Sequence, residues 1–301
     1  MSYHVPVLLK EAINALNVKS DGTYADLTFG GGGHSVELLS HLKNGKLMVF
    51  DQDNEAFKNL GDNKNVIPVH ANFRYIRQFM RYHNIKGFDG IIADLGVSSW
   101  QIDQEKRGFS FRFDAELDMR MNPDAPLKAK DIINGYSKEQ LIRVFKEYGE
   151  LKNAGVIVRK IIDARNTGNI NTTGDLKELL SPMFRKGTEN KFLARVFQAL
   201  RIEVNQEIES LKDFLKVSPL ILKQGGRLVT LSYHSLEDRL VKNMMRFGNI
   251  EGEVKKDFYG NVITPFKQIT RKPIQADDEE IKRNQRARSV KMRIAELKTH
   301  E

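Results

Sequence analysis

The sequence of 301 residues contains no cysteine, which excludes disulfides, thiolate nucleophiles and cysteine-ligated zinc. No apolar run reaches the roughly 20 residues that a membrane-spanning helix needs. The opening residues, MSYHVPVLLKEAIN, lack the basic and then apolar order of a secretory signal. Internal repeats and low-complexity segments are also missing. We therefore expect a cytoplasmic protein of at most two domains.

Positive charge is in excess. The formal net charge is +9, and residues 239–301 hold 15 Lys and Arg against 9 Asp and Glu. Basic surfaces attract polyanions because binding releases counterions, so nucleic acid is a candidate partner. A charge that serves only solubility is the alternative.

Residues 23–94 alternate strand-like and helix-like segments. The apolar runs TYADLT, KLMVFD, NVIPVHAN and FDGIIAD are separated by HSVELLSHL, NEAFKNL and FRYIRQFMRYH, which space apolar residues three and four apart. This order predicts an α/β fold with a parallel sheet and helices on both faces. In such sheets, ligands bind at the carboxyl ends of the strands.

The alternation then stops for a long stretch that reads as helices. SKEQLIRVFKEY begins with a capping box at Ser137 and Gln140, and residues 191–216 carry one apolar stripe that predicts a single long helix. Strand patterns resume in GGRLVTLSYHS, NVITPFKQIT and SVKMRIAEL, the last two as an antiparallel addition at one edge. We predict a sheet domain, residues 1–105 and 217–301, with a helical domain, 106–216, inserted in it.

Four consecutive glycines, residues 30–33, separate the first strand from the first helix. Such a turn lets backbone N–H groups approach a nucleotide-like ligand. The dinucleotide fingerprint G-x-G-x-x-G/A is matched imperfectly, because its third small position falls on Ser35 or Val36. Asp26, just before the loop, would repel a pyrophosphate but suits a cationic cofactor without phosphate, such as S-adenosylmethionine.

Two further positions indicate a nucleoside. Asp51 lies 17 residues beyond His34, at the end of the second strand, where it can accept hydrogen bonds from both ribose hydroxyls. Phe73 follows the third strand and can pack on an adenine or belong to the core. The position of Asp51 is shared by NAD and S-adenosylmethionine sites, so an NAD-linked oxidoreductase remains an alternative.

The fourth strand runs directly into ADLGVSSWQID, residues 93–103. An exocyclic amine of a base is a weak nucleophile, so a site must align it and accept its hydrogen bonds; Asp94 or the carbonyls after it can do so. Asp94 can instead bind the methyl donor. The arginines and aromatic residues of segment 107–123 suit contacts with unpaired bases and phosphates, or belong to an ordinary surface loop.

Together these segments resemble the bacterial RsmH (MraW) family, which methylates N4 of a cytidine in the decoding region (P site) of 16S small-subunit rRNA. The matching segments cover nearly the whole chain in family order: HVPVLLKEAI, DLTFGGGGH, DQD, DLGVSSWQID, RGFSF, LDMRM, FQALRIEVNQE, SYHSLEDRLVK and RARSVKMR. The resemblance implies a class I (Rossmann-like) methyltransferase sheet with S-adenosylmethionine as cofactor. It implies that the donor is held by Gly32, Gly33, His34, Asp51, Phe73, Asp94 and Gln101.

The resemblance also implies that the helical insert helps to recognise RNA. Three departures from the family pattern stand out: Tyr233 replaces the usual Phe, Gln285 replaces the usual Pro, and the His-Pro that usually precedes Arg195 is absent. The candidate RNA contacts are Arg107, Arg112, Arg195, Arg201, His234, Arg239, Arg286 and Arg288.

The segment SYHSLEDR, residues 232–239, invites a hydrolase interpretation, but the G-x-S-x-G elbow of such enzymes is absent. His234 either touches the target base or is a hydrogen-bonded structural histidine, and we predict the second. We assign no metal ligands, and we expect a monomer or homodimer whose partner is 16S rRNA in the small ribosomal subunit, without a membrane. An RNA-binding assembly factor that lacks catalysis is the rival from another class.

Overall fold

The computed structural model describes residues 6–61, 63–184 and 186–299. His4 and Val5 of the first family segment therefore lie outside the described residues. The chain forms two compact units, one of residues up to Gly96 and from Ile208 onward, the other Val97–Glu207. The second unit begins and ends somewhat earlier than the predicted insert of residues 106–216.

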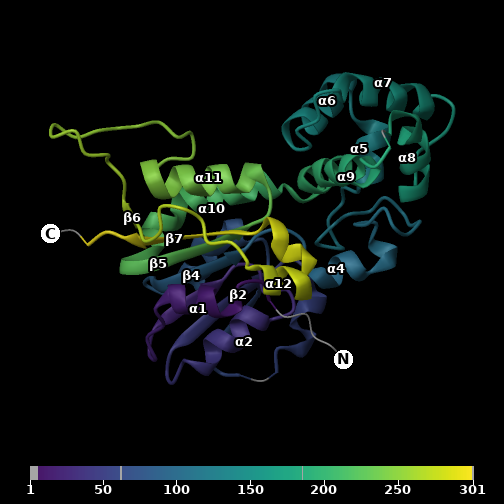
Figure 1. Cartoon of the computed structure of the whole chain (residues 1–301). Helices are drawn as coiled ribbons and strands as arrows, with labels where there is room; N and C mark the ends of the chain where they lie inside the picture. The colour runs from purple at the N-terminus through teal and green to yellow at the C-terminus, as the bar shows by residue number, and fades with distance from the viewer. Residues whose placement is uncertain (1–5, 62, 185, 300–301) are drawn as a thin grey trace. The chain divides into compact units, whose positions relative to one another are not determined.

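The first unit is built on a seven-stranded sheet with the order β3-β2-β1-β4-β5-β7-β6 (Figure 1). The strands β1 to β5 are parallel, and β7 lies antiparallel between β5 and β6. The predicted α/β class and the antiparallel addition are thus confirmed. The order reverses between β1 and β4, and ligands of such sheets bind at this switch point. The strands are β1 (Thr23–Asp26), β2 (Lys46–Asp51), β3 (Val66–His70), β4 (Phe88–Asp94), β5 (Leu222–Ser232), β6 (Phe266–Gln268) and β7 (Lys291–Leu297).

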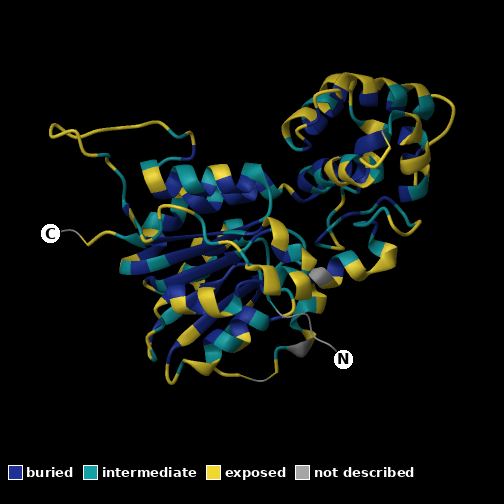
Figure 2. Ribbon diagram, in the orientation of Figure 1, coloured by how far each residue is buried: buried dark blue, intermediate teal, exposed yellow. Residues whose placement is uncertain are grey.

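Helices cover both faces of this sheet, so its strands are buried on both sides (Figure 2). In β2, Leu47 and Val49 pack in a core with α1 and α2, while Met48 and Phe50 pack in a second core with α3, α10 and α11. Side chains of a strand alternate between its two faces, so β2 contributes to both cores. The helices of this unit are α1 (Leu9–Leu16), α2 (Gly33–Ser40), η1 (Asn54–Asn59), η2 (Phe73–Tyr75), α3 (Ile76–Tyr82), α10 (Glu207–Ile221), α11 (Ser235–Phe247), α12 (Asp278–Arg283) and η5 (Gln285–Ser289).

The second unit is helical and has a separate apolar core. The predicted capping box is confirmed: Ser137 Oγ accepts the N–H of Gln140 at 3.2 Å, and Gln140 Oε1 accepts the N–H of Ser137 at 2.8 Å. The helices are α4 (Ser99–Asp103), η3 (Glu105–Arg107), α5 (Ala129–Gly135), α6 (Lys138–Glu147), α7 (Ala154–Arg165), α8 (Thr173–Leu180), η4 (Ser181–Met183) and α9 (Glu189–Asn205).

The predicted single helix over residues 191–216 is wrong. It is two helices, α9 and α10, separated by Gln206, whose φ of 49° is left-handed. The side chain of Asn205 accepts the N–H of Met121 at 2.6 Å and donates to the carbonyl of Met119 at 2.8 Å. These bonds fix the end of α9 to segment 119–121. No helix within the described residues is both long and apolar enough to cross a membrane.

Candidate active site

The glycine loop, residues 30–33, joins β1 to α2. Gly30 and Gly32 have φ of 52° and 78°, in the left-handed region that side chains disfavour. A Cβ on Gly33 would lie 2.0 Å from Cγ of Pro6, whereas a Cβ on Gly31 would meet nothing within 4 Å. The fold itself therefore favours glycine at positions 30, 32 and 33, while the backbone at Gly31 borders open space that a ligand can use.

The N-terminal segment that packs on Gly33 is held from its other side by the C-terminal part of the chain. The N–H of Leu8 donates to Oε1 of Glu280, in α12, at 2.7 Å. Segments far apart in the sequence thus meet beside the glycine loop.

Asp26 is the last residue of β1 and forms hydrogen bonds with residues on both sides of the glycine loop. The side chain is 2% exposed, and it accepts hydrogen bonds from the hydroxyl of Ser35 at 2.6 Å and the N–H of Thr28 at 3.0 Å. Burial raises the pKa of this carboxyl above its usual value. Asp26 therefore links the residues on either side of the glycine loop and adds a carboxyl group next to it.

Asp51 is the last residue of β2 and forms a hydrogen bond with the glycine loop. Its Oδ2 accepts the N–H of Gly30 at 2.8 Å, and its Oδ1 accepts the N–H of Asp53 at 2.8 Å. Burial raises the pKa of Asp51 to about 6. The two hydrogen bonds lower this pKa, but burial has the larger effect. Each oxygen keeps a second lone pair, so the carboxylate can still accept hydrogen bonds from a ribose.

His34 lies in the first turn of α2 and is buried. Its Nε2 lies 3.1 Å from the carbonyl oxygen of Val7; because a carbonyl only accepts, Nε2 carries the proton of this bond. Its Nδ1 lies 4.0 Å from Oδ2 of Asp94. The imidazole therefore connects the N-terminal segment to the end of β4.

Asp94 ends β4, on the other side of the switch point from Asp26. Its Oδ1 accepts a hydrogen bond from the hydroxyl of Tyr233 at 2.7 Å, and its N–H donates to Oγ1 of Thr28 at 2.7 Å. Burial raises the pKa of Asp94 to about 6, although 27% of its side chain stays exposed. Sequence reasoning missed Tyr233 as a site residue; the signal was a tyrosine where the family usually has phenylalanine.

The three carboxylates Asp26, Asp51 and Asp94 make one acidic edge. Within the described ranges, none of them has a Lys or Arg within 4.0 Å. The charge of Asp26 raises the pKa of both other carboxyls. An acidic edge with no Lys or Arg beside it attracts a positively charged ligand and repels a pyrophosphate. These residues thus fit S-adenosylmethionine, and they do not fit the dinucleotide alternative.

Two further predicted donor contacts have partners of their own within the protein. Phe73 begins η2 and makes an edge-to-face contact with Phe214, with ring centroids 6.0 Å apart. Gln101 belongs to the second unit, where its N–H donates to Oγ of Ser98 at 3.2 Å, and Ser98 thereby caps α4. Their contacts with the donor remain predictions.

The predicted RNA contacts divide into two groups. Arg201 makes a two-pronged pair with Glu207, at 2.8 and 3.0 Å, and Arg107 donates to the carbonyls of Arg120 and Met121 at 2.6 and 3.1 Å. These guanidinium groups stabilise the second unit itself. By contrast, the following residues are exposed: Arg112, Arg195, Arg239 and Arg288. Arg286 is half-buried in η5, where its N–H donates to Asn284.

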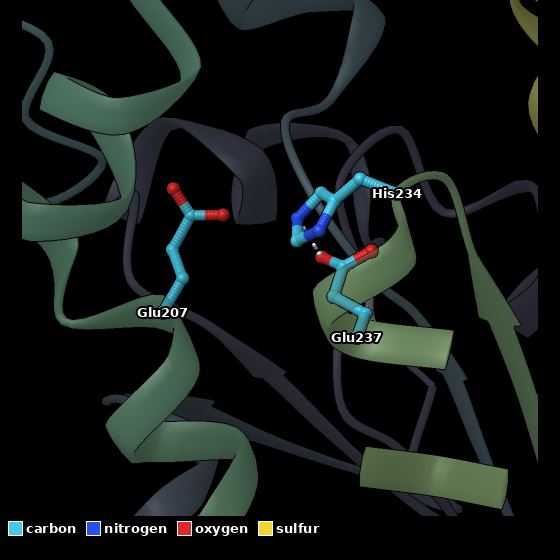
Figure 3. Close-up of side chains that lie close together, drawn as sticks. All are labelled: Glu207, His234 and Glu237. Atoms are coloured by element: carbon cyan, nitrogen blue, oxygen red, sulfur yellow. Dashed lines mark ion pairs between the residues drawn. The ribbon is translucent and has the colours of Figure 1, made fainter. Parts of the chain in front are cut away.

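His234 precedes α11 and contacts Glu237, with 3.0 Å between Nε2 and Oε1 (Figure 3). Neither ring nitrogen has a well-directed hydrogen bond to a residue that the structure describes. Glu237 also accepts the N–H of Tyr233 at 3.1 Å, and the next residue, Asp238, accepts from Arg293 at 2.6 Å. These acids attach α11 to the sheet, a role that the sequence did not indicate.

Comparisons with known proteins show which family the chain belongs to. The sequence matches the model of the MraW methylase family over residues 1–298. Two proteins named Ribosomal RNA small subunit methyltransferase H are similar to it: one from Bacteroides thetaiotaomicron, 53% identical over 299 residues (99% of this chain, 98% of the relative), and one from Flavobacterium johnsoniae, 54% identical over 297 residues (98% of each). A solved rRNA methylase from Streptococcus thermophilus has a TM-score of 0.41 at 10% identity, covering 99% of this chain and 100% of that one. The chain belongs to the MraW methylase family, which confirms the predicted family and the prediction of an enzyme.

Proposed function

We propose that this protein is an S-adenosylmethionine-dependent methyltransferase that acts on N4 of a cytidine in the decoding region of 16S rRNA. Family membership and the name shared by its relatives support the reaction class and the RNA. The observation that carries the donor assignment is the acidic edge at the β1–β4 switch point, whose carboxylates have no Lys or Arg partner among the described residues.

S-adenosylmethionine, when bound, supplies a methyl group that its sulfonium makes electrophilic. Asp51 would accept the ribose hydroxyls, and the backbone at Gly31 would border the bound nucleoside. Oδ1 of Asp94 accepts from Tyr233, so Oδ2, which lies 4.0 Å from Nδ1 of His34, would accept an N–H of the target amine and orient its lone pair. The negative charge of the Asp94 carboxylate also favours a cationic donor.

The remaining assignments extend this proposal. The helical unit would recognise RNA through exposed arginines such as Arg112 and Arg195, and the basic C-terminal region would add Arg239 and Arg288. The net charge of +9 supports a polyanionic partner. We propose the small ribosomal subunit as the substrate, a cytoplasmic location, and a monomer or homodimer.

The test compares 16S rRNA from cells with and without the gene by mass-spectrometric mapping of modified bases. We expect one cytidine to lose a methyl group on N4 and to regain it when purified protein and labelled donor are added to the deficient subunits. Binding without transfer of label would favour an assembly factor instead. Equilibrium dialysis provides a second check, because retention of NAD and not of S-adenosylmethionine would reverse the donor assignment.

A further inference from the structure

A groove on the first unit lies between α3 and α10 and has a volume of about 450 Å³. Its lining is dominated by cations: Arg74, Arg77 and Arg81 from η2 and α3, and Lys216 from α10. Asp213 is the one carboxylate in this lining. We call this the cationic groove.

One of the four cations is neutralised within the fold. The guanidinium of Arg74 forms an ion pair with Asp213, with 2.9 Å between Nε and Oδ2. Arg77, Arg81 and Lys216 are exposed, and their side chains form neither a hydrogen bond nor an ion pair with any residue that the structure describes. Arg77 and Arg81 are four residues apart, so they project from one face of α3 and repel each other. The fold gains nothing from this concentration of charge, which indicates an external anion.

The groove begins close to the edge of the sheet where the donor is expected. Asn72 follows β3, and its side-chain amide donates to the hydroxyl of Ser210, in α10, at 3.0 Å, which ties the two walls together. Arg74 comes directly after Phe73, the predicted adenine contact. An aromatic ring, Tyr75, stands at the groove with 47% of its surface exposed.

We propose that the cationic groove binds the phosphates of the RNA strand that flanks the target nucleotide. This inference rests on the proposed function and adds a contact surface on the sheet unit. Guanidinium forks and a lysine ammonium are the donors that phosphate oxygens prefer. Tyr75 can stack on an unpaired base, which favours RNA over an acidic protein.

The test is a triple variant, Arg77→Gln, Arg81→Gln and Lys216→Gln. The matched control is Lys43→Gln, Lys46→Gln and Lys64→Gln, which removes three other exposed charges near the amino ends of β2 and β3, at the opposite edge of the sheet. Binding to protein-free 16S rRNA is measured over a range of salt concentrations. We expect the groove variant to bind at least about tenfold more weakly at 0.15 M salt and to lose roughly 2 from the slope of log K against log salt, since each phosphate contact contributes about 0.7.

Further measurements separate the possible failures. Dialysis of S-adenosylmethionine should give the same affinity for both variants and for the unmodified protein, and both should melt at the unmodified temperature. Equal RNA affinity and slope for the two triple variants would overturn the inference. Normal affinity for bare RNA with weaker binding to whole subunits would instead make the groove a contact for a ribosomal protein, and the RNA inference would be wrong. Absence of methyl transfer by the unmodified protein would count against the proposed function, while the RNA-binding comparison would still decide the groove.

Discussion

The hydroxyl of Tyr233 donates a hydrogen bond of 2.7 Å to Oδ1 of Asp94, across the ends of neighbouring strands β5 and β4. Burial raises the pKa of Asp94, whereas this bond lowers it, because a donor stabilises the ionised carboxylate. Tyr233 therefore acts as a positioning residue: together with His34, which lowers the same pKa more, it favours the ionised form of Asp94, and it occupies Oδ1.

Replacing Tyr233 by Phe tests this relationship. Loss of the bond should raise the pKa of Asp94 above about 6, so the acid limb of the pH–rate profile for methyl transfer should move to higher pH. Tyr24→Phe is the control, since its hydroxyl accepts the N–H of Lys19 at 2.7 Å, at the far end of β1. Both variants should lose about 1 kcal/mol of stability. Superimposable pH profiles for Tyr233→Phe and Tyr24→Phe would refute the role.

Replacing Asp94 by Asn should stabilise the free protein at pH 7.5 by about 1–3 kcal/mol. The sign follows from the pKa of about 6 in the folded state, which is above the usual 3.8: folding disfavours the ionised form, and the penalty is complete only above that pKa. The gain should shrink as the pH falls toward 4, where the carboxyl is protonated in both states. Denaturant titrations at several pH values measure it.

Asp89, on the same strand, supplies the opposite case. Burial would raise its pKa, but bonds from Lys223 at 2.5 Å and from the N–H of Thr23 at 2.9 Å outweigh burial and lower it. Asp89→Asn should therefore destabilise the protein at pH 7.5. If Asp94→Asn and Asp89→Asn destabilise the protein equally, folding does not disfavour the ionised form of Asp94.

The role of Asp94 in chemistry needs a kinetic separation. Asp94→Ala should lower both the affinity for S-adenosylmethionine and the single-turnover rate at saturating donor, because the carboxylate serves the cation and the amine. A normal single-turnover rate with reduced donor affinity would restrict Asp94 to donor binding.

Two glycines of the loop should respond differently to alanine. Gly33→Ala should destabilise the protein by about 1–3 kcal/mol, because its Cβ would overlap with Pro6. Gly31→Ala has space in the free protein and should leave stability unchanged, yet it should weaken donor binding if the nucleoside borders the loop. Thermal melting and dialysis distinguish the two effects, and full donor affinity in Gly31→Ala would place the ligand elsewhere.

Two arginines of α9 form a second matched pair. Arg201→Ala should cost about 1–3 kcal/mol of stability, because it leaves Glu207 without its two-pronged partner. Arg195 is exposed, so Arg195→Ala should leave stability unchanged and weaken binding to 16S rRNA. Unaltered RNA affinity in Arg195→Ala would remove this residue from the proposed interface.

Local signals were enough to predict the strands that end at Asp51 and Asp94 and the glycine loop between β1 and α2. Each depends on a short apolar run, a turn residue or a capping pattern. The break at Gln206 was not predictable, because the apolar stripe continues across it and Asn205 is turned by bonds to residues 119–121. The contacts of Tyr233 and Arg201 were also missed, since both depend on partners that only the folded chain brings close.

The packing of Pro6 on Gly33 and the hydrogen bond from Leu8 to Glu280 have a consequence for the order of folding. The segment that packs on Gly33 has its hydrogen bond from Leu8 only when Glu280 of α12 is present. In a nascent chain that still lacks α12, the glycine loop is already synthesised, but Glu280, the partner of Leu8, is not. The N-terminal segment beside the glycine loop therefore gains this hydrogen bond only after α12 has been synthesised.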